Sequence, residues 1–210
     1  MSGDYLRDPA EIYARSFATI RAEADLSGVP AELEDVVVRM VHASGMAEIV
    51  PDIRWGGEVA GEVEFALVEG APVFCDCEMV RAGISRKHLP EKSELVVTLD
   101  DPRVPALAEG LETTRSAAAV ELWRDRLEGA VVVIGNAPTA LFRLLDLLDA
   151  GAAKPAAIIA TPVGFVGAAE SKARLAMGLH DVPFLTLLGR RGGSAIAAAA
   201  LNAILRNFAA

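Results

Sequence analysis

Residues 156–172, AAIIATPVGFVGAAESK, constrain the fold of this chain more than any other stretch. They are typical of a short buried strand at 156–160, a turn bearing Pro and Gly at 161–167, and a following helix that carries Lys172. In an open α/β sheet, ligands bind in the crevice outside the carboxyl ends of the strands. Glycines there let the backbone come close, and a helix N-terminus offers N–H groups to an anion. The stretch therefore predicts a strand–turn–helix unit with a site for an acidic small molecule.

The same alternation of a short apolar run and a helical pattern recurs along the chain. We expect five strands, at residues 72–77, 95–99, 130–134, 156–160 and 184–188. We expect helices at residues 58–67, 106–126, 138–148, 168–177 and 194–207. Short apolar runs between helices indicate a parallel sheet with helices on both faces. The predicted fold is α/β, a three-layer α/β/α arrangement with a mostly parallel five-stranded sheet, whose strand order the pattern does not give.

A pair of helices is predicted ahead of the sheet. Asp8 and Pro9 mark the start of the first helix, which runs to about residue 24. The second begins near Pro30 and stops at Gly45. Its apolar residues follow the pattern of a one-sided core stripe: Leu33, Val36, Val37, Met40 and Val41. Residues 55–57, Trp-Gly-Gly, are expected to form a loop.

The length of 210 residues predicts one domain spanning residues 1–210. No run of 18 or more apolar residues occurs, so no transmembrane helix and no membrane partner are expected. The N-terminus lacks the apolar core of a signal peptide, which predicts a cytoplasmic protein.

The net charge of −9 argues against nucleic acid as a partner. The charge is unevenly spread, because residues 1–130 carry 13 Lys and Arg against 25 Asp and Glu, whereas residues 131–210 carry 7 against 4. A chain that is acidic overall can therefore present a locally basic site. Ordinary surface patterning is the other explanation of this asymmetry.

Cysteines and histidines give no metal pattern. Cys75 and Cys77 alternate in a strand-like run, which places both side chains on one face but is not the C-x-x-C spacing of zinc or redox sites. We interpret them as small buried thiols in a reducing compartment. The three histidines are dispersed, so no metal site is expected. Asp76 and Glu78 either pair as acid and base or cap a loop. No phosphate-binding glycine motif and no G-x-S-x-G elbow occur.

His42 and Arg39 fall on the face of the second helix opposite its core stripe. They are either solvated or line a cleft. In a cleft, a histidine can give and take a proton near neutral pH, and an arginine can hold the carboxylate of an acidic ligand. Ser16 is in line with Ile12 and Ile20 on the first helix. It either bonds back to its own backbone or faces a pocket between the helices.

Two more turns follow predicted strands and open helices. Residues 135–139, Gly-Asn-Ala-Pro-Thr, follow the third strand, and residues 189–194, Gly-Arg-Arg-Gly-Gly-Ser, follow the fifth. The second turn combines glycines with two arginines, which suits a carboxylate or a phosphate. Arg115 precedes an Ala-rich helical run and either reaches the same crevice or pairs with a surface acid.

Seven segments of the chain resemble the precorrin-8X methylmutase family. They occur in family order from about residue 5 to residue 202: IYARSFATIRAEADL, VVVRMVHASG, GAPVFCDCEMVRAGI, TTRSAAA, GNAPTAL, PVGFVGAAESK and GRRGGSA. No motif of the family is missing. The N-terminal segment is similar to the cobalt-free, aerobic branch.

The resemblance implies an isomerase of cobalamin biosynthesis. The family moves a methyl group from ring carbon 11 to ring carbon 12 of precorrin-8X, a suprafacial 1,5-shift that yields hydrogenobyrinic acid, with no metal or redox cofactor. The shift needs a changed electron distribution in the macrocycle rather than a nucleophile, so one histidine that places or removes a proton suffices. By resemblance this histidine is His42, and the family's substrate contacts correspond to Ser16 and Arg39.

The substrate's rim of acetate and propionate groups requires several cations and N–H donors. We infer that Arg115, Lys172 and the turn at 189–194 supply them. The resemblance also implies a homodimer with the site near the subunit interface, which would explain why Arg39 and His42 point away from their helix's core stripe.

Product-like complementarity could make the site bind its product tightly, which suggests direct hand-over to the next pathway enzyme. The alternatives are the cobalt-containing counterpart, cobalt-precorrin-8 methylmutase, and a tetrapyrrole carrier with no catalytic step. A flavodoxin-like nucleotide binder is opposed by the absence of phosphate loops from the sequence.

Overall fold

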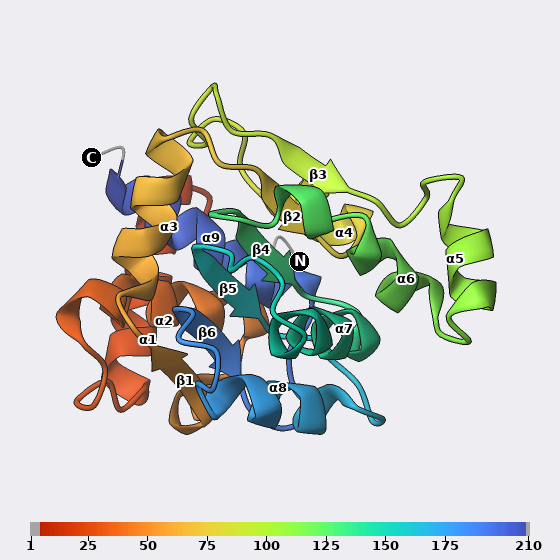
Figure 1. Ribbon diagram of the computed structural model, residues 1–210. Helices are drawn as coiled ribbons and strands as arrows, with labels where there is room; N and C mark the ends of the chain where they lie inside the picture. Colours follow the sequence, from red (N-terminus) through yellow and green to blue (C-terminus); the bar gives the residue numbers. More distant parts are fainter. Residues whose placement is uncertain (1–4, 209–210) are drawn as a thin grey trace.

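The computed structural model describes residues 5–208, in which one sheet is covered by helices on both faces (Figure 1). Its strands are β1 (Ile53–Gly56), β2 (Val73–Cys75), β3 (Leu95–Val97), β4 (Val131–Ile134), β5 (Ala157–Ala160) and β6 (Phe184–Leu187). The strand order is β1-β6-β5-β4-β2-β3. All neighbouring pairs are parallel except β1 with β6. The predicted α/β class with a mostly parallel sheet is confirmed, with one strand more than expected.

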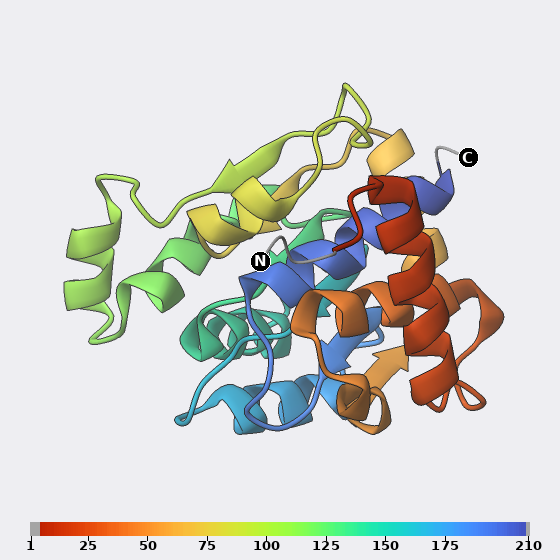
Figure 2. The ribbon, with the colours of Figure 1, turned by 180° about the vertical axis from the view of Figure 1, so that it is seen from behind.

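The helices form two layers around this sheet. They are α1 (Pro9–Glu23), α2 (Ala31–Ser44), η1 (Ala47–Asp52), α3 (Val59–Val68), α4 (Glu78–Gly83), α5 (Val104–Gly110), α6 (Arg115–Glu121), η2 (Arg124–Arg126), α7 (Pro138–Asp149), α8 (Ala168–Ala176) and α9 (Ser194–Phe208). Successive side chains of a strand point to opposite faces. Val131 and Val133 of β4 therefore join the core under α2, α3 and α9, whereas Val132 and Ile134 join the core under α7. Figure 2 shows α9 crossing the sheet on the side of α1 and α2.

The two N-terminal helices form as predicted. The Asp8 carboxylate caps α1 by accepting the N–H groups of Ala10 at 2.8 Å and Glu11 at 3.2 Å. α2 ends at Gly45, whose φ of 68° is the left-handed conformation that glycine adopts without strain. All five residues of the predicted stripe are buried, and α2 packs chiefly against α9.

The loop predicted at residues 55–57 is wrong, because Trp55 and Gly56 belong to β1. This strand is only four residues long and lies at the edge of the sheet. Its hydrogen-bond partner is the distant β6, with Arg54 opposite Thr186. Such a pairing is tertiary, and the short stretch before Gly-Gly carries no clear period of two.

The single helix predicted at residues 106–126 is also wrong. The chain there forms α5, α6 and η2 instead. Glu112 adopts a left-handed φ of 49°, which breaks the helix, and the Thr114 hydroxyl caps α6 by accepting the Ala117 N–H at 3.2 Å. α4 also forms outside the helices that the sequence pattern predicts.

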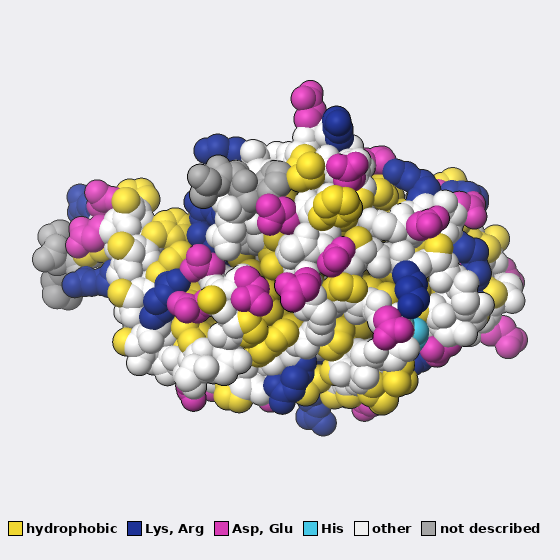
Figure 3. Space-filling view, turned by 60° about the vertical axis from the view of Figure 1, so that its left-hand side comes forward, with side chains coloured by type: hydrophobic (Ala, Val, Ile, Leu, Met, Phe, Trp, Pro, Cys, Tyr) yellow, Lys and Arg dark blue, Asp and Glu magenta, His cyan; other side chains and the backbone are white. Residues whose placement is uncertain are grey.

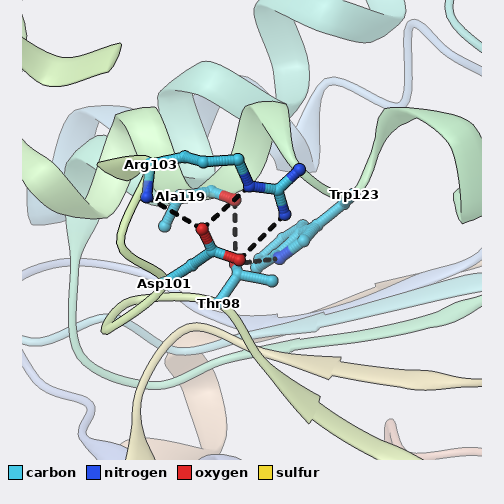
Figure 4. A network of polar contacts seen from close by, with 5 residues as sticks. All are labelled: Thr98, Asp101, Arg103, Ala119 and Trp123. Atoms are coloured by element: carbon cyan, nitrogen blue, oxygen red, sulfur yellow. Dashed lines mark hydrogen bonds and ion pairs between the residues drawn. The ribbon is translucent and has the colours of Figure 1, made fainter. Parts of the chain in front are cut away.

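α5 and α6 extend from the sheet as an arm whose base is a polar network (Figures 1 and 4). The Thr98 hydroxyl oxygen accepts the indole N–H of Trp123 at 2.8 Å and donates to a carbonyl of α6 at 2.8 Å. The Arg103 guanidinium donates to both carboxylate oxygens of Asp101, each at 2.8 Å. Since Trp123 is buried, this network fixes the arm to the end of β3.

Side chains of every type share one face of the molecule. Figure 3 looks onto the side that lies at the left of Figure 1, where α3 is found, and shows acidic, basic and hydrophobic side chains interleaved. Glu62, Glu64 and Phe65 of α3 are exposed, whereas Arg190 and Arg191 are exposed after β6. Within residues 5–208, no helix has the length and apolarity needed to cross a membrane.

Candidate functional site

The pairing of α1 with α2 brings Ser16 and His42 together. The Ser16 hydroxyl oxygen lies 2.9 Å from Nδ1 of His42, although the residues are 26 positions apart. Ser16 therefore faces the space between the two helices, and His42 is exposed. Because Ser16 engages Nδ1, the ring nitrogen left to face a ligand is Nε2.

α1 is attached to the rest of the fold lightly. Ile20 is its only residue classed as buried. At the same end, the Arg21 guanidinium donates to Glu34 at 3.1 Å and to Asp35 at 2.5 Å, in ion pairs that are exposed to solvent. Exposed ion pairs contribute about 0–1 kcal/mol each, so the position of Ser16 depends on modest contacts.

Aromatic rings surround the histidine. The Phe17 ring meets the His42 ring edge-on at 5.3 Å, and the Tyr13 ring lies 5.7 Å from it. The Arg39 guanidinium lies over Phe17 at 5.0 Å from the ring centre. Partial burial, and then the charge of Arg206, lower the pKa of Arg39 below its usual value. Arg39 and His42 thus share one aromatic neighbour and one face of α2.

A cleft of about 430 Å³ opens between α1 and α2 beside His42, and Arg39 is not part of its lining. Its lining consists of Leu6, Ile12, Arg15, Ser16, Thr19, Ile20, Glu23, Val41, His42, Gly45 and Ala47. The exposed fractions of Ile12 and Tyr13, at 43% and 50%, leave apolar surface at the edge of the cleft. The cleft therefore offers a partly apolar ligand the imidazole of His42, two hydroxyl groups and the guanidinium of Arg15.

Two loops at the carboxyl ends of β5 and β6 are joined to each other. The Gly193 N–H donates to the Thr161 carbonyl at 2.7 Å, and the Gly164 N–H donates to the Arg190 carbonyl at 3.1 Å. A Cβ at Gly192 would lie 2.2 Å from the Thr161 carbonyl oxygen, so only glycine fits there. These two joined loops lie at the carboxyl edge of the sheet, where the sequence predicts a ligand site.

The joined loops lie next to the cleft. The Arg191 guanidinium reaches the Glu48 carbonyl of η1 at 3.5 Å, and Ala47 of the same η1 lines the cleft. Phe165 and Val166 are 84% and 89% exposed in the first loop. The joined loops therefore carry exposed apolar side chains together with exposed arginines.

Asp76 is the buried acid that shapes a third loop. Its carboxylate accepts the N–H groups of Gly135, Asn136 and Ala137 at 2.7–3.0 Å. Burial raises the pKa of Asp76, and these three N–H groups oppose that shift. Glu78 instead pairs with Arg81 at 2.6 Å on the surface. Of the two alternatives for Asp76, the loop cap is the one that the structure contains.

Lys172 and Arg115 do not lie beside His42 in this chain. Lys172 is fully buried, and its ammonium donates to the Arg191 carbonyl at 2.5 Å. Arg115 begins α6 and donates to Asp100 at 3.0 Å. Figures 1 and 2 agree in placing α6 and α1 at opposite ends of the molecule. One chain therefore brings Ser16, Arg39 and His42 together and leaves Arg115 apart.

Sequence reasoning missed Tyr13 and Phe17 as neighbours of the histidine. Their i, i+4 spacing on α1 was the available signal, because residues so spaced share one helix face. Within residues 5–208, no three His, Cys, Asp or Glu side chains gather where they could hold a metal ion.

The sequence and the fold correspond to one known protein family. The family model described as precorrin-8X methylmutase matches residues 11–207. The chain belongs to the precorrin-8X methylmutase family.

Named relatives support this membership along nearly the whole chain. The precorrin-8X methylmutase of Pseudomonas aeruginosa is 56% identical, covering 96% of this chain and 97% of the relative. The cobalt-precorrin-8 methylmutase of Priestia megaterium is 36% identical over 93% and 87%. The solved precorrin-8X methylmutase structure from Thermus thermophilus superposes with a TM-score of 0.84 at 33% identity, covering 95% of this chain and 96% of that one.

Proposed function

We propose that this chain is an isomerase of cobalamin biosynthesis that moves a methyl group from ring carbon 11 to ring carbon 12 of precorrin-8X, giving hydrogenobyrinic acid. The observation that carries the proposal is the Ser16–His42 hydrogen bond of 2.9 Å at the cleft between α1 and α2, in a chain of this family.

His42 is the proposed catalytic residue. An isomerisation gains and loses no atoms, so a proton that His42 places on the macrocycle must return to it after the methyl group has moved. Protonation draws electron density from the conjugated ring and lowers the barrier to migration. A positioned acid–base group of this kind contributes about 10²–10⁴-fold in rate.

The neighbours of His42 have separate roles in this proposal. Ser16 fixes the orientation of the imidazole through Nδ1, which leaves Nε2 toward the substrate. Tyr13 and Phe17 offer ring surface to a flat macrocycle. Arg39 binds a substrate carboxylate, and its stacking on Phe17 holds it on the same side of α2.

The relatives favour the cobalt-free substrate. Identity is 55–56% to two relatives named precorrin-8X methylmutase and 31–37% to five named cobalt-precorrin-8 methylmutase, although the Thermus thermophilus precorrin-8X methylmutase is also only 33% identical. We therefore expect faster turnover of precorrin-8X than of cobalt-precorrin-8 at equal concentration. Faster turnover of the cobalt-containing compound would reverse this assignment.

The visible spectrum of precorrin-8X mixed with the purified protein tests the central proposal. Methyl migration changes the conjugated path of the ring, so conversion shifts the absorption bands. We expect conversion by the native protein and by His88→Ala, a control histidine outside the cleft lining, but not by His42→Ala. Perturbed bands without conversion by the native protein would identify a tetrapyrrole carrier instead.

We also propose a homodimer in which a second copy completes the site. The proposal is supported by the separation of Arg115 from His42 within one chain and by exposed apolar side chains of α1 beside the cleft. In a two-fold dimer, the Arg115 of one copy can meet the His42 of the other. Each chain is proposed to be one domain, which is supported by the family match over residues 11–207.

Mixed dimers test this arrangement. In a dimer of one His42→Ala chain and one Arg115→Ala chain, both substitutions would fall in one site and the other site would be intact. Random exchange of the two inactive proteins should then restore about a quarter of the native activity. No restoration would place Arg115 outside the shared site, and sedimentation as a monomer would remove the dimer itself.

Hand-over of the product to the next enzyme is the last part of the proposal. A site complementary to the rearranged ring binds product more tightly than substrate. The dissociation constant of hydrogenobyrinic acid from the native protein should therefore be lower than that of precorrin-8X from His42→Ala, which is expected to bind the substrate without converting it. The opposite order would count against direct hand-over.

A further inference from the structure

Lys172 occupies an unusual position for a lysine. Its side chain has no exposed surface, and its ammonium donates to the main-chain carbonyl of Arg191 at 2.5 Å. Burying an ammonium is costly unless its hydrogen bonds are made inside the protein. The burial of this lysine therefore indicates that its hydrogen bond to the Arg191 carbonyl has a specific role.

The bond joins helix α8 to a loop that is distant in sequence. Lys172 lies in α8, directly after the loop at residues 161–167, whereas Arg191 lies in the loop at residues 189–194. The same two loops are linked by the N–H groups of Gly164 and Gly193, which donate to carbonyls of the opposite loop at 3.1 and 2.7 Å. Lys172 thus closes this set of contacts from the buried side.

The joined loops present charged and apolar side chains outward. The Arg190 guanidinium lies 5.4 Å from the centre of the exposed Phe165 ring. Arg191 reaches η1, which continues into the lining of the cleft that holds His42. Any shift of the Arg191 main chain would therefore move both arginines relative to the cleft.

We propose that Lys172 is a positioning residue that locks the loops at 161–167 and 189–194 together and so fixes Arg190 and Arg191 for the substrate's carboxylates. This inference rests on the proposed function, because the carboxylates belong to the proposed substrate. Lys172 touches no ligand in this arrangement. It acts through the Arg191 carbonyl, not as the rim cation that its sequence position suggested.

The surrounding charges agree with a protonated lysine at neutral pH. Burial lowers the pKa of Lys172 to about 8, and the carboxylate of Asp52 in η1 opposes that shift. The Leu188 N–H donates to the Asp52 carbonyl at 2.9 Å, so the same η1 residue is tied to the start of the second loop. Arg190 and Arg191 are the cations that the loop itself carries, and both are exposed.

Residue-resolved amide exchange of Lys172→Met tests the lock without any substrate. We expect the amides of Gly164 and Gly193 to exchange about tenfold faster or more, while the amides of β4 keep their protection. Lys154→Met is the matched control, because Lys154 is exposed and its nearest acid, Asp181, is 3.9 Å away. Unchanged exchange at Gly164 and Gly193 would overturn the proposal.

Turnover of precorrin-8X then tests the consequence for binding. Lys172→Met should raise KM about tenfold and change kcat less than about twofold, because the lost interaction serves ground state and transition state alike. A fall of about tenfold in kcat with an unchanged KM would overturn the positioning role. Lys172→Gln keeps a donor near the Arg191 carbonyl, so its KM should rise less than that of Lys172→Met. This variant replaces Lys172→Met if the methionine variant does not fold.

The two proposals fail in different ways. If the native protein does not convert precorrin-8X, the proposed function is wrong, whereas the exchange rates of Gly164 and Gly193 still report on the lock. If the native protein converts precorrin-8X but Lys172→Met leaves exchange and KM unchanged, only the lock is wrong.

Discussion

The helix pair around His42 and the loops at the carboxyl edge of the sheet are held in place by different means. Ser16 meets His42 through an exposed hydrogen bond, and α1 is tethered by exposed ion pairs and by buried Ile20. The loops instead depend on the buried charged groups of Asp76 and Lys172. Exposed contacts contribute little, whereas a buried polar group left without its partners costs several times more. The half proposed to move a proton can therefore adjust, while the half proposed to bind carboxylates is rigid.

Removal of the Asp76 carboxylate should have the largest effect on stability. Asp76→Ala leaves three N–H groups of the third loop without their acceptor, and we expect a loss of about 3 kcal/mol or more in the free energy of unfolding. Glu78→Ala, at an exposed neighbouring position, should change it by less than about 0.5 kcal/mol. Denaturant unfolding of both variants measures the contrast. Equal effects would mean that the loops are no more rigid than the surface.

The pH dependence of stability should reveal the buried lysine next. The pKa of Lys172 is about 8 in the folded chain against 10.5 when unperturbed, so between these values the unfolded chain holds a proton that the folded chain has released. Unfolding then takes up a proton, and raising the pH stabilises the fold by at most about 1.4 kcal/mol per pH unit. Below pH 8 the residue is protonated in both states and adds no slope. Denaturant unfolding from pH 7 to 10.5 gives the free energy of unfolding of the native protein and of Lys172→Met. The difference between the two should rise with pH, and a difference that does not change with pH would refute this prediction.

The hydrogen bond to His42 should matter for catalysis and little for folding. Ser16→Ala removes a hydrogen bond worth about 1 kcal/mol that orients the imidazole, so we expect kcat to fall about fivefold with little change in the unfolding midpoint. Ser27→Ala removes a serine hydroxyl that bonds only to nearby Asp25, and it serves as the control. A kcat equal to that of the control would leave Ser16 without a role in orienting His42.

The tether of α1 should show the smallest effect. Arg21→Ala removes both exposed ion pairs to α2, and we expect a loss of less than about 1 kcal/mol in the free energy of unfolding. Raising the salt concentration should weaken the native contacts in the same way. A loss comparable to that of Asp76→Ala would contradict the view that α1 is lightly attached.

The sequence predicted the parts of the fold that depend on local pattern. Apolar runs located β2 to β6, and Asp8 and Gly45 marked where the first two helices begin and end. β1 escaped prediction because its pairing with β6 is a tertiary contact at a sheet edge. The break at Glu112 escaped because a left-handed φ at a glutamate has no strong local signal.

The candidate site likewise contains features that a local sequence pattern predicts and features that depend on tertiary contacts. Helix periodicity placed His42 and Arg39 together on one face of α2, away from the core. The contact of Ser16 with Nδ1 depends on how α1 crosses α2, which no local pattern encodes. Lys172 was expected at the rim, and its burial depends on two loops meeting after β5 and β6 have paired.

The packing of α2 against α9 carries a consequence for the order of assembly during synthesis. A ribosome makes α2 before any strand of the sheet and α9 after all of them. The helix that bears His42 must therefore wait for the late α9 to cover its apolar stripe. Until then that stripe is exposed to chaperones and to other nascent chains, and the helix that bears His42 reaches its final packing only as one of the last folding steps.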